Sequence, residues 1–485
     1  MSEQHLDVVQ GYPKSRLMGL ILGAGFLLMT ILVPPPESMA IEAWSALGLM
    51  LLMATWWSTE AIPIPATALL PIVLIPGLGL GTVSQATSPY AHPIIFLFLG
   101  GFTLGLAMQR WDLHRRIALM TLKTVGNQPK RQIAGFMLAT AFLSMWVSNT
   151  ATAIMMLPIG LSVISMMGNG QSENVQRYAT ALLLGIAYAA SVGGIATLIG
   201  TPPNALLAAY LSETQGVSVG FAQWMLLGVP VATVMLVLIW WWLTRRGFGL
   251  SAQEGAGQTI DDELAALGDM SRGEKLVAAV FVLTASAWIF RPLLSASAMP
   301  WLTDTGIAIS AAIAMFIIPV NVRQQTFVLD WDTAKVIPWG VLLLFGGGLA
   351  MAGVISSSGL ASWIAASMGA ASALPVIVLI MLVVAVIIFL TEVTSNTATA
   401  AAFLPLLGAL ALAQDASPLL LTIPAAIAAS CAFMMPVATP PNAIVFSSGH
   451  MKIGDMIRAG FALNVMGIVV VTLLCYLLMD FVFKM

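Results

Sequence analysis

The six-residue sequence SNTATA occurs twice in this chain, at residues 148–153 and, 247 positions later, at residues 395–400. A recurrence of this length in 485 residues is improbable by chance. A second pair supports it, because FLGGFTLGLA (98–107) corresponds to FGGGLAMAGV (345–354) at the same offset. The chain is therefore predicted to contain two copies of one structural unit.

Both copies lie in a chain that has too few charges for a soluble protein. Hydrophobic residues make up 59% of it and charged residues 8%, whereas soluble domains carry roughly 25% charged residues. Apolar runs of about 20 residues, the length that crosses a bilayer as a helix, recur along it, and the alternating strands of a membrane barrel are absent. The prediction is an all-α polytopic membrane protein, with spans near 17–33, 43–58, 61–78, 92–120, 177–210, 222–244, 275–293, 303–320, 338–365, 420–449 and 458–483.

Two further apolar stretches, 132–166 and 373–413, are interrupted by SNT near their midpoints. Each could be two ordinary spans joined by a turn, or a re-entrant hairpin of two half-helices that meet inside the membrane. Non-helical backbone survives in hydrocarbon only where protein buries it or where it lines a cavity. The repeated polar tip favours re-entrance, since a simple external turn need not keep one sequence twice.

The positive charges give the topology. With a cytoplasmic N-terminus and hairpins that enter and leave on one side, all of the 19 Lys and Arg residues except Arg291 and Lys484 fall inside. This excess of positive charge on the cytoplasmic side is expected of a correct topology in the inner membrane. Two full spans per hairpin would give the same distribution of charges. The hairpins then open to opposite faces, as in the inverted repeats of many secondary transporters.

TPPNA, at 201–205 and again at 439–443, predicts a break inside each of two apolar helices. Two consecutive prolines remove two N–H donors and disfavour helix at the preceding threonine. The carbonyls freed by a break are ligands for a cation, and the start of the next half-helix offers unpaired N–H groups to an anion. Paired breaks in duplicated register are more than an ordinary proline kink.

The hairpin tips supply matching polar groups. Ser148 and Ser395 are expected to cap the second half-helix of each hairpin, and the following Asn and Thr bring amides and hydroxyls. No Lys or Arg lies in these motifs, so a bound anion needs positive charge from hard cations held beside it. Glu60 and Glu392 lie in apolar context and are further candidates for proton or ion sites.

The motifs resemble those of the divalent anion:sodium symporter family, which carries dicarboxylates, citrate or sulfate. The resemblance rests on both SNT tips, both TPPN breaks, WWSTEAIPIPATALLP (56–71) and ASCAFMMPVATPPNAIV (429–445), and it covers essentially the whole chain. It implies a homodimer in the lipid membrane, each protomer with eleven spans and two re-entrant hairpins, in which a transport part slides as an elevator against a scaffold.

The same resemblance divides the chain. Residues 1–131 and 275–372 are expected to form the scaffold, 247–274 the cytoplasmic linker, and 132–246 and 373–485 the transport part. The transport part contains the hairpins 132–166 and 373–413 and the broken helices 177–210 and 420–449.

The resemblance also implies the binding residues. One sodium ion is expected among Ser144, Ser148, Asn149 and Gly200, and a second among Thr391, Thr394, Asn396 and Ala438. Substrate carboxylates are expected at Asn149, Thr150, Thr201 and Pro202 from one repeat and at Asn396, Thr397, Thr439 and Pro440 from the other.

The predicted function is sodium-coupled import of C4-dicarboxylates such as succinate, malate or fumarate. A dicarboxylate exchanger and a sodium/sulfate symporter remain alternatives on the same fold, and a channel fits a closed site less well. An intramembrane enzyme would need a nucleophile–base pair or a metal cluster, but the four histidines are scattered, and Cys431 and Cys475 read as packed thiols. Sodium is the expected co-transported ion, with no organic cofactor and no nucleic-acid partner.

Overall fold

The computed structural model describes residues 14–126, 128–166, 172–248, 254–297, 299–367 and 375–484. These residues are mostly helical, as predicted. The residues before Lys14, which belong to the predicted cytoplasmic N-terminus, and residues 249–253 of the predicted linker lie outside this description.

The first half of the chain contributes thirteen α-helices and one short 3-10 helix to the described structure. Their bounds are α1 Lys14–Leu32, α2 Ile41–Thr59, α3 Ile64–Thr67, α4 Leu70–Gly77, α5 Val83–Thr87, η1 Ser88–Ala91, α6 Pro93–Arg110, α7 Leu113–Val125, α8 Pro129–Ser144, α9 Asn149–Met166, α10 Glu173–Ile195, α11 Pro202–Gln215, α12 Phe221–Thr244 and α13 Glu254–Ala266.

The second half adds ten helices and a small antiparallel hairpin of two strands, which the sequence did not predict. Their bounds are α14 Arg272–Ser297, α15 Asp304–Ile317, β1 Pro319–Asn321, β2 Thr326–Phe327, α16 Trp331–Ala334, α17 Trp339–Ser357, α18 Leu360–Ser367, α19 Val376–Thr391, α20 Asn396–Leu412, α21 Leu419–Ala428, α22 Pro440–Phe446 and α23 Ile453–Phe483.

The helix ends reproduce the sequence repeat. In the first hairpin α8 ends at Ser144 and α9 begins at Asn149; in the second, α19 ends at Thr391 and α20 begins at Asn396, each 247 positions later. The SNT tips therefore interrupt both hairpins at the same place. Both TPPN motifs also open a helix, α11 at Pro202 and α22 at Pro440, as predicted.

Three stretches that were predicted as single spans are divided. The stretch 61–78 forms α3 and α4, because Pro63, Pro65 and Pro71 each lack an N–H donor. The stretch 92–120 separates into α6 and α7 at Asp112, whose backbone has φ +54°, and 338–365 separates into α17 and α18 at Gly359, with φ +79°. A left-handed residue cannot continue a right-handed helix.

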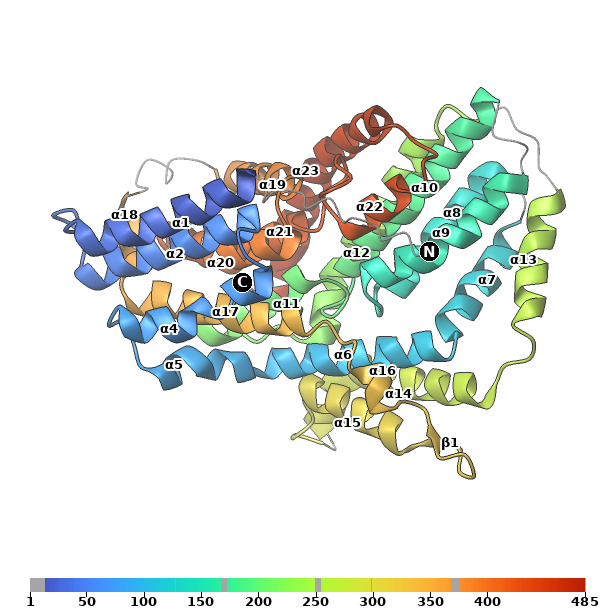
Figure 1. Cartoon of the computed structure of the whole chain (residues 1–485), viewed down its shortest axis with the longest axis horizontal. Coiled ribbons are helices and arrows are strands. Elements are labelled where there is room, and N and C mark those ends of the chain that lie inside the picture. Colours follow the sequence, from blue (N-terminus) through green and yellow to red (C-terminus); the bar gives the residue numbers. More distant parts are fainter. Residues whose placement is uncertain are drawn as a thin grey trace, which may run out of the picture.

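The half-helix that follows each break packs against the other repeat. In Figure 1 the first hairpin, α8 and α9, lies to the right and the second, α19 and α20, to the left. α11 packs against α20 and α21 of the second repeat, and α22 packs against α9 and α10 of the first. This exchange brings the TPPN break of each repeat beside the hairpin of the other.

Eight helical segments of the described residues are long and apolar enough to cross a membrane. They are Lys14–Leu32, Val83–Arg110, Asn149–Met166, Glu173–Ile195, Phe221–Thr244, Arg272–Ala296, Trp339–Ser357 and Ile453–Phe483. Shorter apolar helices, among them Val376–Thr391 and Asn396–Leu412, lie between them. The chain is a polytopic helical membrane protein.

The stretch predicted as a linker contains α13, which packs on α7 and on α9. Ion pairs fix it to α7, with Lys123 Nζ 2.8 Å from Asp261 Oδ1 and a second pair between Arg115 and Glu263. Just beyond α13, the buried Arg116 guanidinium lies 2.6 Å from Glu274 Oε1 at the start of α14. The segment is therefore a packed element and not a free connection.

The close contact of α8 with α10 depends on Gly193, where an added Cβ would lie 2.4 Å from Ala141 O and 2.6 Å from Ala141 Cα. We expect Gly193→Ala to destabilise the protein by ~1–3 kcal/mol, because the obstructing atoms are backbone and cannot rotate away. A lower midpoint in thermal denaturation of the detergent-solubilised protein would show this.

The matched control is Gly25→Ala in α1, where an added Cβ would meet no atom within 4 Å. It should leave the midpoint unchanged or raise it, since alanine favours helix over glycine. Equal effects of the two substitutions would contradict the packing described here.

Candidate functional site

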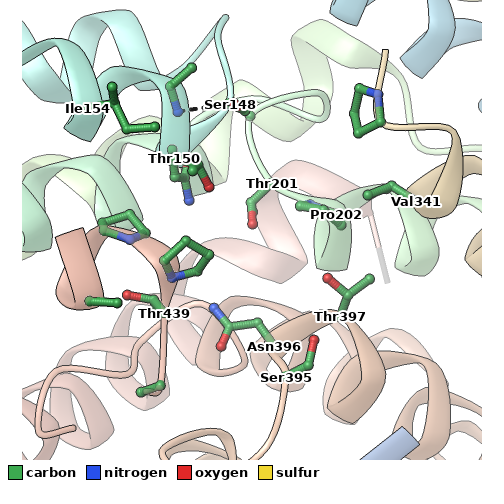
Figure 2. Close-up of a pocket in the computed structure, with 18 of the residues that line it drawn as sticks. Ser148, Thr150, Ile154, Thr201, Pro202, Val341, Ser395, Asn396, Thr397 and Thr439 are labelled. Atoms are coloured by element: carbon green, nitrogen blue, oxygen red, sulfur yellow. Dashed lines mark hydrogen bonds between the residues drawn. The ribbon is translucent and has the colours of Figure 1, made fainter. Parts of the chain in front are cut away.

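A cavity of about 1090 Å³ lies between the two hairpin tips and the two TPPN breaks (Figure 2). Figure 2 shows Ser148 and Thr150 on one side, Ser395, Asn396, Thr397 and Thr439 on the other, and Thr201 and Pro202 between them. Most residues that the sequence singled out line this one cavity: Ser148, Asn149, Thr150, Gly200, Thr201, Pro202, Thr394, Asn396, Thr397, Ala438, Thr439 and Pro440.

Ser144 and Thr391, the other two predicted residues, are fully buried and do not line the cavity. Each instead contacts the asparagine of its own tip. Ser144 Oγ lies 2.6 Å from the end of the Asn149 amide, and Thr391 Oγ1 donates to Asn396 Oδ1 at 2.7 Å. The two hairpins thus repeat the same contact behind their tips.

Oxygen atoms gather around the Asn149 amide. One end of this amide lies 2.6 Å from Ser144 Oγ, 3.1 Å from Ala190 O and 3.2 Å from Gly200 O. With its nitrogen at this end, Asn149 donates hydrogen bonds to all three; with its oxygen there, four oxygens face one another. Facing oxygens repel unless a cation lies among them, and hard cations prefer oxygen ligands.

The second tip has a matching arrangement. Thr391 Oγ1 also lies 3.1 Å from Ala429 O, as Ser144 Oγ lies 2.7 Å from Ala190 O. We call the group around Asn149 the first oxygen cluster and the group of Thr391, Asn396 and Ala429 the second. The Ala190 and Ala429 carbonyls were missed from the sequence, because a backbone oxygen has no side-chain signature.

Gly200 must be a glycine in the first cluster. An added Cβ would lie 2.4 Å from Gly194 O and 2.8 Å from Gly194 Cα, so no side chain fits between these two backbone segments. At the corresponding place in the second repeat, Ala438 lines the cavity. The two breaks therefore share a sequence motif, but only at Gly200 do two backbone segments lie so close that a Cβ is excluded.

An asparagine holds each break in shape. Asn204 Nδ2 donates to the carbonyls of Gly194, Ile195 and Thr197 at 3.2, 3.3 and 2.8 Å. Asn442 Nδ2 does the same for Ala432 O at 3.2 Å and Met435 O at 3.1 Å. Both side chains are completely buried. The prolines of TPPN predicted the two breaks but not this role of the asparagine, although the asparagine recurs in both copies.

Four helices begin at the cavity. Asn149, Asn396, Pro202 and Pro440 are the first residues of α9, α20, α11 and α22, and all four line the cavity wall. A helix N-terminus carries the positive end of the helix dipole and can offer unpaired N–H groups. Because α11 and α22 each begin with two prolines, which have no N–H, these two ends contribute mainly the dipole. The convergence of all four helix ends favours an anion.

The hydroxyls differ in what they bond. Ser148 Oγ accepts from Ala151 N at 3.3 Å, which confirms the predicted cap of α9, whereas the Ser395 side chain makes no capping bond and lines the cavity. Thr439 Oγ1 caps α22 by accepting from Asn442 N. Thr201 Oγ1 lies 3.5 Å from Ser430 Oγ, a contact between the two repeats.

Glu392, a sequence candidate for an ion site, is buried but does not line the cavity. Its carboxylate accepts hydrogen bonds from the backbone N–H groups of Phe433, Met434 and Met435 at 2.7 to 3.0 Å and from Asn464 Nδ2 at 2.8 Å. It therefore anchors the second helix break.

One pair of opposite charges stands at the edge of the cavity. Arg16 and Glu60 both line it, with Arg16 Nη2 3.0 Å from Glu60 Oε2. They are the only charged residues among the described residues that line the cavity. The wall near the tips is thus polar but uncharged, as the motifs predicted.

Residues 14–484 match the family described as the sodium:sulfate symporter transmembrane region. The chain belongs to this family. It is therefore a membrane transporter and not an enzyme.

Relatives within the symporter family are similar over almost the whole chain. The sodium-dependent dicarboxylate transporter SdcS of Staphylococcus saprophyticus is 42% identical over 97% of this chain and 92% of its own length. SdcS of Staphylococcus aureus is 44% identical over the same shares. The family predicted from the SNT and TPPN motifs is therefore confirmed.

Solved structures show the same fold at low identity. The Alcanivorax borkumensis YdaH transporter aligns with a TM-score of 0.61 at 15% identity, covering 97% of this chain and 99% of that one. Neisseria gonorrhoeae MtrF aligns with a TM-score of 0.59 at 12% identity, covering 96% and 95%. These likenesses concern the fold alone.

We expect Asn204→Asp to weaken both folding and transport. The substitution keeps the side-chain size but points a carboxylate oxygen at three carbonyl oxygens, so the first break loses its donor; one unsatisfied buried group costs ~1–3 kcal/mol. Thermal denaturation and uptake by reconstituted protein measure the two effects.

The control is Asn174→Asp at the start of α10, where Asn174 Oδ1 accepts from Arg177 Nη2 at 2.7 Å and a carboxylate can accept equally well. It should behave as the unchanged protein. A stable, fully active Asn204→Asp variant would show that the amide does not hold the break.

Proposed function

We propose that this chain is a sodium-coupled transporter that imports C4-dicarboxylates such as succinate, malate or fumarate. The observation that carries the proposal is the pair of matching oxygen clusters on either side of one cavity. The names of the SdcS relatives, sodium-dependent dicarboxylate transporters, support the same substrate class.

Charge explains why sodium and substrate bind together. A dianion in the uncharged part of the cavity meets hydroxyls, amides and helix N-termini, which carry partial charges only. Sodium ions in the two oxygen clusters supply the missing full charges and fix the tips in place. If sodium tightens substrate binding by some factor, substrate tightens sodium binding by the same factor.

In this proposal the carboxylates of the substrate meet the two repeats separately. Asn149, Thr150 and Thr201 take one, with Pro202 beside them. Asn396, Thr397 and Thr439 take the other, with Pro440 in the same position. The first sodium lies among Ser144, Ser148, Asn149 and Gly200, and the second among Thr391, Thr394, Asn396 and Ala438.

The substrate crosses the membrane by movement of the transport part, 132–246 and 373–485, against a scaffold of 1–131 and 275–372 in an inner-membrane homodimer. The hairpins 132–166 and 373–413 are re-entrant and open to opposite faces. The cavity reaches Arg16 and Glu60, at positions predicted to be cytoplasmic, which supports an inward-open arrangement.

Sulfate is a second candidate cargo, because the family description names it. Two sets of donors could also hold a tetrahedral dianion. Competition separates the two substrates: excess sulfate should leave uptake of labelled succinate almost unchanged, and unlabelled succinate or fumarate should abolish it. Strong inhibition by sulfate would favour the second candidate.

Proteoliposomes with an inward sodium gradient should accumulate labelled succinate, and replacement of sodium by potassium should abolish the uptake.

Thr150→Ala and Thr397→Ala should each raise the succinate concentration for half-maximal uptake by about 10-fold or more, since a hydrogen bond to a charged group is worth roughly 1.5–3 kcal/mol.

Vesicles preloaded with unlabelled succinate test the exchanger alternative. A symporter takes up label into empty vesicles, whereas an exchanger requires the internal substrate. Uptake that ignores the sodium gradient but depends on preloading would overturn the proposal of sodium symport.

Movement between the two parts can be arrested by a cross-link. His92 Nε2, before α6, lies 3.7 Å from Glu213 Oε2 on α11, so the pair joins the proposed scaffold to the proposed transport part. We expect a short bifunctional thiol reagent to stop uptake by the His92→Cys/Glu213→Cys variant, and reduction of a cleavable reagent to restore it.

The native thiols should not interfere, because Cys431 and Cys475 are both buried. Each single-cysteine variant, treated in the same way, is the control and should keep its uptake. Undiminished uptake by fully cross-linked protein would exclude relative movement of these two elements.

A further inference from the structure

The two repeats differ at one residue behind their tips. Glu392 follows the last residue of α19, and the residue at the same place in the first repeat, 247 positions earlier, is Met145. Both lie one position after a hydroxyl of an oxygen cluster, Thr391 in one repeat and Ser144 in the other. The twin sites therefore differ by one carboxylate.

The repeats also tie their breaks in different ways. In the first, Thr197 Oγ1 donates to Met145 O at 2.6 Å, a neutral hydrogen bond. In the second, the residue that corresponds to Thr197 is Met435, and its backbone N–H donates to Glu392 Oε2 at 2.9 Å. A side-chain carboxylate has replaced a backbone carbonyl as the acceptor.

The groups that donate hydrogen bonds to the Glu392 carboxylate carry no full charge. All are N–H groups, three of the backbone and one of the Asn464 amide, and none is a cation. Both carboxylate oxygens accept only from neutral N–H groups, so the hydrogen-bond partners place no full positive charge beside the carboxylate. Its side chain is 3% exposed, so water screens the charge poorly.

The charge lies on the segments that build the second cluster. Thr391 of the second cluster is the preceding residue, and the segment that the carboxylate anchors, 433–435, lies in the chain between Ala429 of that cluster and Ala438 at the cavity. A fixed negative charge in a poorly screened interior attracts a nearby cation strongly. At the corresponding position behind the first cluster stands Met145, which carries no charge.

We propose that Glu392 makes the two sodium sites unequal, so that the second oxygen cluster binds sodium more tightly and fills first. The inference rests on the proposed function, since it takes both clusters to be sodium sites. The first cluster then fills at higher sodium concentration and is the one whose occupancy is most strongly linked to substrate.

Equilibrium binding of radioactive sodium to the purified protein, without substrate, tests the order. We expect two affinities for the unchanged protein, at least 10-fold apart. Thr391→Ala should abolish the tighter one, and Ser144→Ala should leave it intact while removing the weaker one. Loss of the tighter sodium binding in Ser144→Ala alone would reverse the order of filling and overturn the inference.

Glu392→Gln tests the charge itself. It should weaken the tighter sodium affinity about 10-fold or more and leave the weaker one within about two-fold, and the sodium dependence of uptake should shift in the same direction. Met145→Gln is the matched control and should change neither affinity.

Thermal denaturation shows whether Glu392→Gln folds. If it does not, the comparison of Ser144→Ala with Thr391→Ala still decides the order of filling. Two equal affinities in the unchanged protein, or an unaltered tighter affinity in folded Glu392→Gln, overturns the inference alone. Unchanged sodium binding in both Ser144→Ala and Thr391→Ala overturns the proposed function as well.

Discussion

Helix breaks inside an apolar protein are the constraint on which this structure depends. A broken helix exposes carbonyl and N–H groups that hydrocarbon cannot solvate, so each must find a partner within the protein. The amide of Asn204 gathers three such carbonyls in the first repeat, and Asn442 gathers two in the second. With the breaks held in this way, their remaining polar groups are left for ligands.

Because α11 and α22 each pack against the opposite repeat, the two separate helix breaks come together at one site. Both TPPN motifs and both SNT tips face a common cavity (Figure 2). Four helix N-termini begin there, and the oxygen clusters lie beside them. The proposed function places an anion at these positive dipole ends and its counter-ions at the neighbouring oxygens.

Duplication does not make the two halves equal. Gly200 and Ala438, Thr197 and Met435, and Met145 and Glu392 occupy corresponding places with different side chains. The oxygen contacts of the tips have nevertheless stayed the same, Ser144 with Asn149 and Thr391 with Asn396. Two of these differences, Thr197 with Met435 and Met145 with Glu392, lie behind the tips, whereas Gly200 and Ala438 line the cavity itself.

The sequence by itself determined the membrane class, the duplication and the four breaks, because hydropathy, exact recurrence and proline chemistry are local properties. Only the tertiary structure decided which breaks meet, since the crossing of α11 and α22 is a contact between distant segments. It also revealed the Ala190 and Ala429 carbonyls, which no side chain announces, and the N–H donors around Glu392. The divisions at Asp112 and Gly359 carry a local signal that hydropathy alone did not use, because polar residues surround both, with Arg110 before Asp112 and three serines before Gly359.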